Sequence, residues 1–147
     1  MIAAHKELRE RIIYQAHADK EAKIWLSKTD QETILAFEYM QISESLKTSY
    51  IDDFVGADTF IYEAGLASRQ FVLEGHGVVY GGEFNYVSVG MMAAHYGHSL
   101  GIVAAQSTVW NMRQLITGEG FHNYEQMFSG AYWGGYGHEY YNQQQSR

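Results

Sequence analysis

The sequence predicts a mainly α-helical fold: a single helical domain, residues 1–147, with a small β-hairpin or glycine-rich loop near residues 78–86. The chain contains no proline, so the strongest helix breaker is absent. Apolar residues recur at helical spacing along much of the first half. Residues 84–112 hold no Asp, Glu, Lys or Arg, which is typical of a buried central helix.

Helices dominate the expected first half of the chain. In chain order, we expect a helix over residues 5–26, a capping turn over 28–30, a helix over 31–47, a polar connection over 50–58 and a helix over 59–73. In the second helix, Ile34 and Ile42 lie on one amphipathic face. Either Phe37 or Glu38 lies between them on that face.

The second half begins with the only β signal that we find. Two short β-prone runs flank the pair Gly81-Gly82, which indicates a hairpin with arms at residues 78–80 and 84–86. After it we expect the charge-free helix over residues 87–115, a short helical piece over 122–128, an aromatic and glycine-rich loop over 130–141 and a frayed polar end over 142–147.

Composition divides this single domain near residue 74. Residues 1–74 are charged and contain only Gly56 and Gly65 of the fifteen glycines. Residues 75–147 are rich in glycine, aromatic residues and histidine. No linker-like segment separates the two parts. We therefore expect a helical scaffold half followed by a functional half.

The overall charge restricts the classes of ligand. The formal net charge is −7, and there is no cysteine, so disulfides and thiolate metal sites are excluded. A protein that binds nucleic acid by neutralising many phosphates normally carries a basic face, which this composition does not indicate. The acidic net charge is compatible with a protein that binds a small molecule, a glycan or a basic protein, or with a nuclease that relies on local contacts.

Neither the N-terminus nor the charge-free stretch indicates a membrane segment. The first six residues lack a basic run followed by an apolar one, so no signal peptide is visible. The charge-free stretch is long enough to cross a bilayer, but it contains His95, His98 and several polar amides and hydroxyls. We expect a buried helix and no membrane insertion.

The charge-free helix has two distinct faces on a helical wheel. Small residues recur every four positions and predict close approach of another helix; they are Ala93, Gly97, Gly101 and Ala105. A different face carries His95 and His98. These histidines are either core residues whose ring nitrogens are hydrogen-bonded to buried partners or residues that form one wall of a site. They could also share a metal with Glu83, His76 or His138, but no metal-binding motif is present, and we expect neither a metal nor another cofactor.

The loop that leads into this helix carries candidate catalytic groups. Glu74 and Glu83 are either solvated loop charges or proton donors whose pKa is raised by apolar neighbours. Two such carboxylates would also suit a glycosidase. His76 lies between two glycines, and a histidine with a glutamate is sufficient for metal-free RNA cleavage, in which one takes the 2′-hydroxyl proton and the other protonates the leaving oxygen.

The aromatic tail offers a second set of candidates. His138 and Glu139 are adjacent and form either a second acid–base pair or part of a flexible surface loop. Aromatic residues on a glycine-rich segment can stack on bases or sugars, cover the core or form a protein interface. The aromatic residues in question are Tyr132, Trp133, Tyr136, Tyr140 and Tyr141.

The second half resembles a known family. Residues 82–90 read G-E-F-N-Y-V-S-V-G and are followed by a small-residue helix and then a W-G-G-Y-G segment. This pattern, over roughly residues 60–142, resembles the toxin domain called bacterial (polymorphic) toxin type 44. That family comprises C-terminal effector domains of competition systems and is predicted to be ribonucleolytic. The positions carried over are Phe84, Asn85, Tyr86 and Gly90, with His138 and Glu139 as candidates in the tail.

The leading expectation is therefore an antibacterial toxin domain that hydrolyses RNA by metal-independent acid–base chemistry. His76, Glu83 and His95 would transfer protons, and Asn85 and Tyr86 would orient the substrate. One alternative is a lysozyme-like glycoside hydrolase that acts on peptidoglycan, with Glu74 or Glu83 as general acid. The other is a non-enzymatic acidic protein that binds or inhibits a basic partner.

The expected partners follow from these hypotheses. The substrate would be RNA or a glycan. The resemblance to a toxin domain implies a cognate immunity protein and a protein that is secreted or delivered into a target bacterial cell.

Overall fold

The computed structural model describes residues 2–45, 61, 65–99, 101 and 124–147. The mainly α class expected from the sequence is confirmed. The elements, in chain order, are α1 (Ile2–Ala18), β1 (Ile24–Leu26), α2 (Lys28–Ser45), β2 (Gln70–Leu73), β3 (Gly77–Tyr80), α4 (Gly81–Phe84), α5 (Tyr86–His95) and α7 (Tyr124–Gln145). Within the described ranges, no helix is long and apolar enough to cross a bilayer.

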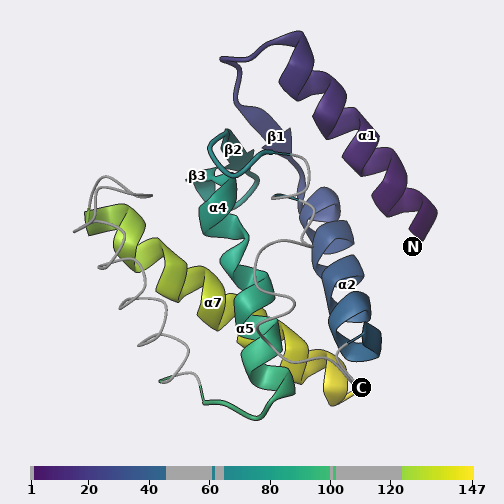
Figure 1. Cartoon of the computed structure of the whole chain (residues 1–147), viewed down its shortest axis with the longest axis vertical. Coiled ribbons are helices and arrows are strands. Elements are labelled where there is room, and N and C mark those ends of the chain that lie inside the picture. Colours follow the sequence, from purple (N-terminus) through teal and green to yellow (C-terminus); the bar gives the residue numbers. More distant parts are fainter. Residues whose placement is uncertain (1, 46–60, 62–64, 100, 102–123) are drawn as a thin grey trace.

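A three-stranded sheet lies at one end of the helices (Figure 1). Its strand order is β1-β2-β3, with β1 parallel to β2 and β2 antiparallel to β3. One face of the sheet is buried, and Phe71 and Leu73 on that face join Ile12 of α1 and Ile34 of α2 in the core. The helices follow one another across the molecule from α1 through α2 to α5, and α5 crosses α7 (Figure 1).

The first helix is shorter than the sequence predicts. Residues 5–26 were expected to be one helix, but α1 ends at Ala18 and residues 24–26 form β1. The side chain of Asp19 accepts hydrogen bonds from the backbone N–H groups of Glu21 and Ala22, which turns the chain. The guanidinium of Arg69 donates to the carbonyl oxygen of Ala16, 2.8 Å away, near the end of α1. A residue far away in sequence therefore stabilises this helix end.

The second helix was expected over residues 31–47, and α2 begins one turn earlier. The backbone N–H of Asp30 donates to Ser27 Oγ at 3.1 Å, and the Asp30 carboxylate accepts the Ser27 N–H at 3.0 Å. This reciprocal pair is a capping box with an aspartate in the acidic position. Arg11 of α1 also donates to the Asp30 carboxylate at 2.7 Å, which joins the two helices. The expected connection over residues 50–58 lies outside the described residues.

The hairpin occupies different residues from those expected. Its arms are β2 and β3, so residues 70–73 are a strand and not the end of a helix over 59–73. Residues 78–80 do form one arm, but residues 81–84 are the short helix α4 and Tyr86 begins α5. Gly75 and Gly77 flank His76 at the true turn and have φ of +87° and +82°, a conformation that favours glycine. The actual turn is therefore residues 74–76.

The charge-free helix was expected over residues 87–115, but α5 ends at His95. Gly97 has φ +78°, and the His98 N–H donates to the Ala93 carbonyl at 2.8 Å. This is the bonding of a Schellman helix end. The expected continuous helix is therefore wrong at Gly97, which lies beyond the end of α5, and Ala105 of the expected ridge lies outside the described residues. Residues 102–115 lie outside the described residues.

The tail is the largest correction. Residues 130–141 were expected to be a loop and residues 142–147 frayed, but α7 runs continuously from Tyr124 to Gln145. Glycines normally disfavour a helix interior by about 1 kcal/mol each relative to alanine. Here they let α7 lie against the backbone of α5. A Cβ on Gly137 would collide with the carbonyl oxygen of Val87.

Candidate functional site

The β2–β3 turn presents one histidine to solvent. His76 is exposed, and its backbone N–H donates to the Leu73 carbonyl at 2.8 Å, which closes the turn. The two flanking glycines adopt left-handed φ values that a residue with a Cβ rarely tolerates. The turn therefore depends on glycine at these two positions, and the histidine side chain is placed outside the core.

Aromatic residues of α7 face this histidine. The ring centroid of His76 lies 5.0 Å from that of Trp133, 5.8 Å from Tyr136 and 6.5 Å from Tyr132. Trp133 is buried and also meets Phe84 of α4 at 5.2 Å. Tyr132 is 56% exposed. Together these rings form a buried wall with one accessible aromatic surface beside a titratable side chain.

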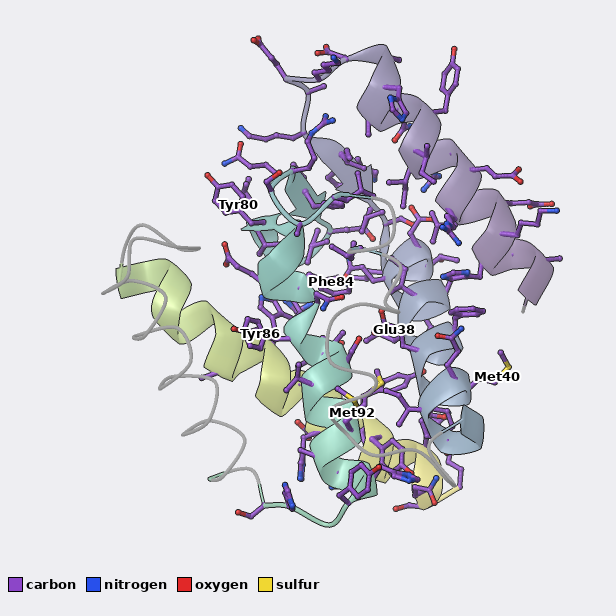
Figure 2. The ribbon with its side chains drawn as sticks, in the orientation of Figure 1. Glu38, Met40, Tyr80, Phe84, Tyr86 and Met92 are labelled. Carbon is purple, nitrogen blue, oxygen red and sulfur yellow. The ribbon has the colours of Figure 1, made fainter. Side chains whose placement is uncertain are left out.

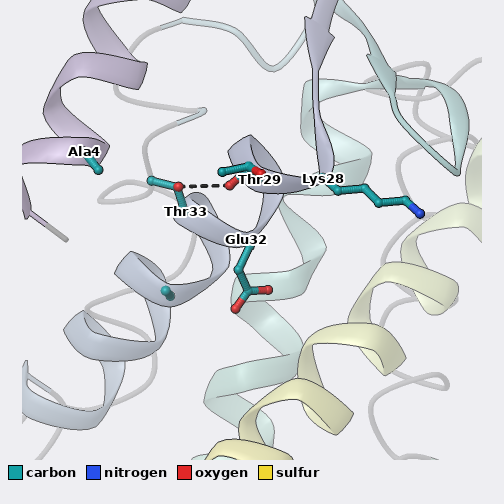
Figure 3. Close-up of a pocket in the computed structure, with 6 residues that line it drawn as sticks. Ala4, Lys28, Thr29, Glu32 and Thr33 are labelled. Atoms are coloured by element: carbon teal, nitrogen blue, oxygen red, sulfur yellow. Dashed lines mark hydrogen bonds between the residues drawn. The ribbon is translucent and has the colours of Figure 1, made fainter.

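A lysine that the sequence did not indicate completes the turn. The backbone N–H of Lys28 donates to Glu74 Oε1 at 3.3 Å. A Cβ built on Gly75 would lie 3.4 Å from Lys28 Cε, so the lysine side chain runs along the turn. In Figure 3 this side chain extends away from Ala4 and Thr33. We define the turn site as Lys28, Glu74, His76, Tyr132, Trp133 and Tyr136.

Acidic and phenolic groups border the turn site. Burial raises the pKa of Tyr136, and the charge of Glu32 adds to the rise, followed by Tyr132 and Glu139. The hydroxyl of Tyr140 donates to Glu32 Oε1 at 3.0 Å. Glu32 and Lys28 also line an open groove of about 630 Å³ along α2 (Figure 3). Glu139 is exposed on α7 and not in a loop, and its charge acts on Tyr136.

The second glutamate singled out from the sequence is a buried residue of α4. Glu83 is 6% exposed, and its Oε1 accepts the backbone N–H of Tyr80 at 3.3 Å. Glu74 and Glu83 follow opposite ends of the hairpin, separated by a strand roughly 10 Å long. The sequence therefore identified two glutamates that the fold attaches to different ends of the sheet.

The two residues expected to orient substrate lie where α4 meets α5. Asn85 is buried, and its Oδ1 has no hydrogen-bond partner within the described part of the chain. Tyr86 is half-buried. Tyr86 is the first residue of α5, and Asn85 precedes it. They belong to the core side of α5 more than to the turn site.

The other three candidate histidines, His95, His98 and His138, lie at the other end of α5. His95 Nδ1 is 2.7 Å from the hydroxyl of Tyr141. His138 is buried, and its Nε2 donates to the carbonyl oxygen of His98 at 2.5 Å. Asn142 Nδ2 lies 3.4 Å from His138 Nδ1 and donates to it. His138 thus joins α7 to the end of α5, and the His98 side chain is exposed.

We expect His138→Leu to lower the free energy of unfolding by about 1–2 kcal/mol, because the carbonyl oxygen of His98 would lose its buried donor. Urea denaturation of the purified protein measures this loss. The matched control is His98→Ala, which removes an exposed ring and leaves the carbonyl in place. Equal stability of His138→Leu and the wild type would show that His138 does not hold these helices together.

Comparisons with known proteins found no relative. No protein-family model, no curated protein and no solved structure matches this chain. The resemblance to a toxin domain stays a prediction.

The described residues offer no metal-binding cluster. No group of three His, Cys, Asp or Glu side chains is placed to hold a metal ion in the ranges that the structure covers. His95 and His98, which the sequence suggested as a pair, point their polar atoms to different partners: the His95 ring meets Tyr141, and His98 contributes its backbone carbonyl.

A buried carboxyl group connects α2 with α5. Glu38 is 2% exposed, and Ser88 Oγ of α5 donates to its Oε2. Burial raises the pKa of Glu38 to about 7, and the Ser88 hydrogen bond opposes that rise. Figure 2 shows Glu38 on the side of α2 that faces α5. The sequence indicated this position only as one of two candidates for the inner face of the helix.

Proposed function

We propose that this protein is a ribonuclease that cleaves phosphodiester bonds in RNA by acid–base chemistry at the β2–β3 turn. The observation that carries the proposal is the position of His76. A side chain able to transfer protons lies on this turn against aromatic rings of α7, with a lysine alongside. Aromatic surfaces stack on bases, and a lysine ammonium offsets phosphate charge.

The residues of the turn site supply the parts of such a reaction. The Glu74 carboxylate takes the proton of the ribose 2′-hydroxyl, whose oxygen then bonds to the adjacent phosphorus. The bond from phosphorus to the 5′-oxygen breaks, and the His76 imidazolium gives a proton to that oxygen. The products are a 2′,3′-cyclic phosphate and a free 5′-hydroxyl. The ammonium of Lys28 offsets the negative charge that develops on the phosphate oxygens.

This assignment changes the roles expected from the sequence. Glu83 is buried against Tyr80, and His95 lies at the far end of α5, a helix about 15 Å long. Neither shares the turn with His76, so Glu74 replaces Glu83 as the carboxylate. The arrangement favours RNA over a glycan, because Glu74 and Glu83 follow opposite ends of the hairpin and the group beside the aromatic wall is a histidine.

We expect His76→Ala to lower the rate of RNA cleavage at least a hundredfold, the usual contribution of a general acid or base. Folding should be unchanged, because the side chain is exposed. The measurement is single-turnover cleavage of a labelled RNA oligonucleotide, with product ends analysed for the cyclic phosphate. The matched control is His17→Ala, which removes an exposed histidine of α1.

Two outcomes would contradict the proposal. His76→Ala could cleave RNA as fast as the wild type does. Alternatively, the wild type could clear cell-wall peptidoglycan and leave RNA intact, which would support the lysozyme-like hydrolase. Delivery into a bacterial competitor, and neutralisation by an immunity protein, remain proposals supported by the family resemblance alone.

A further inference from the structure

The sheet has an outer face that carries two exposed apolar side chains. Cross-strand neighbours in the register point to the same side, so one row contains Trp25, Val72 and Val78. Trp25 is 52% exposed and Val78 is 51% exposed. The adjacent row contains Gln70 and Tyr80, both half-buried. We define the outer sheet face as Trp25, Gln70, Val72, Val78 and Tyr80.

Three exposed lysines lie in the segment that contains the first strand of this face. Its strands contain no acidic residue. Residues 19–28, which include β1, hold three exposed lysines, Lys20, Lys23 and Lys28, against two acids. One of those acids, Asp19, already accepts two backbone N–H groups. An exposed tryptophan therefore lies between exposed lysines, in a chain whose net charge is −7.

The outer sheet face is continuous with the turn site. Val72 precedes Glu74 by two residues, and Val78 follows His76 by two residues, so each is roughly 7 Å of extended strand from the catalytic turn. Lys28 of the turn site follows β1 by two residues, and its side chain runs along Gly75. A chain molecule bound on the face can therefore run directly into the turn.

We propose that the outer sheet face binds a single strand of nucleic acid, with a base stacked on Trp25 and phosphates near Lys23 and Lys28. An exposed aromatic ring with adjacent cations is the arrangement that binds single strands without sequence preference. This inference rests on the proposed function for its choice of ligand. It adds the surface that holds the part of the RNA strand outside the turn.

The test is binding of a fluorescein-labelled single-stranded DNA, measured by fluorescence anisotropy. DNA lacks the 2′-hydroxyl that the proposed reaction uses, so binding is separated from cleavage. We expect Trp25→Ala to weaken binding about tenfold, within the range measured for loss of one base–aromatic stack. Trp25→Phe should retain most of the affinity. Lys23→Gln should reduce the slope of log affinity against log salt by about 0.7.

The control is Tyr14→Ala, which removes an exposed aromatic residue of α1. If Trp25→Ala binds as tightly as the wild type while the wild type cleaves RNA, the outer sheet face is not the binding surface and the proposed function stands. If binding depends on Trp25 and no RNA is cleaved, the binding surface stands and the proposed function is wrong. An equal loss in Tyr14→Ala, or no binding by the wild type, overturns the inference.

Discussion

Gly90→Ala is expected to lower the free energy of unfolding by about 3 kcal/mol or more, because the new methyl group would collide with backbone across the α5–α7 crossing. A Cβ on Gly90 would meet the carbonyl of Gly134, with 2.7 Å to its carbon, and would lie 2.9 Å from the backbone nitrogen of His138. Backbone atoms in a helix cannot turn aside as a side chain can. The two helices would have to separate.

The sign of this effect is informative, because alanine is the better helix former. Helix propensity alone would make Gly90→Ala stabilising by roughly 0.5–1 kcal/mol. The control is Gly101→Ala, where the nearest atom to a new Cβ is Ser99 Oγ at 3.9 Å. Thermal unfolding followed by circular dichroism should show a decrease of about 10 °C for Gly90→Ala alone. A stabilised Gly90→Ala variant would show that α5 and α7 are not packed backbone to backbone.

Glu38→Gln is expected to make the protein more stable at pH 8, by about 3 kcal/mol, and to change its stability little at pH 4. The pKa of Glu38 is raised from 4.5 to about 7 in the folded protein. Below pH 4.5 the carboxyl group is protonated in both the folded and unfolded states. As pH rises toward 7, the unfolded state releases this proton first, so the wild type loses stability; above pH 7 the loss is complete.

The measurement is the free energy of unfolding of both proteins in urea between pH 4 and pH 8. The difference between the two curves isolates Glu38, because the other titrating groups are common to both. Glutamine keeps an oxygen that can accept the Ser88 hydrogen bond. Glu10→Gln removes an exposed glutamate and controls for the change in net charge. A constant difference across this pH range would contradict a raised pKa for Glu38.

The helical class and the first two helices could be predicted because their signals are local. Ile34 and Ile42 mark the inner face of α2, and the cap at its start depends on residues within one turn of each other. The hairpin was misplaced for a local reason. Gly81 and Gly82 were read as the turn, although their N–H groups donate to the carbonyls of Arg69 and Ala67 in the preceding segment.

The aromatic tail shows where local propensity fails. Glycines at four positions of residues 130–137 argued for a loop, and α7 is nevertheless a helix there. Contact with α5 compensates for the low helix propensity. Position 137 can approach the backbone of Val87 only because Gly137 has no Cβ. The sequence pattern of one segment does not contain this contact with another helix, so it cannot predict the helix.

The candidate site also combines features that the local sequence predicts with contacts that depend on tertiary packing. A histidine between two glycines indicated an exposed turn, and a run of aromatic residues indicated a stacking surface, because both features lie within a few residues. The contact of the His76 ring with the α7 aromatic rings depends on packing between segments far apart in the chain. The contact of Lys28 with Glu74 and the burial of Glu38 against Ser88 depend on the same kind of packing. Local patterns determine which side chains are available. Only the packing of α7 on α5, and of the hairpin on α2, decides which of them share a site.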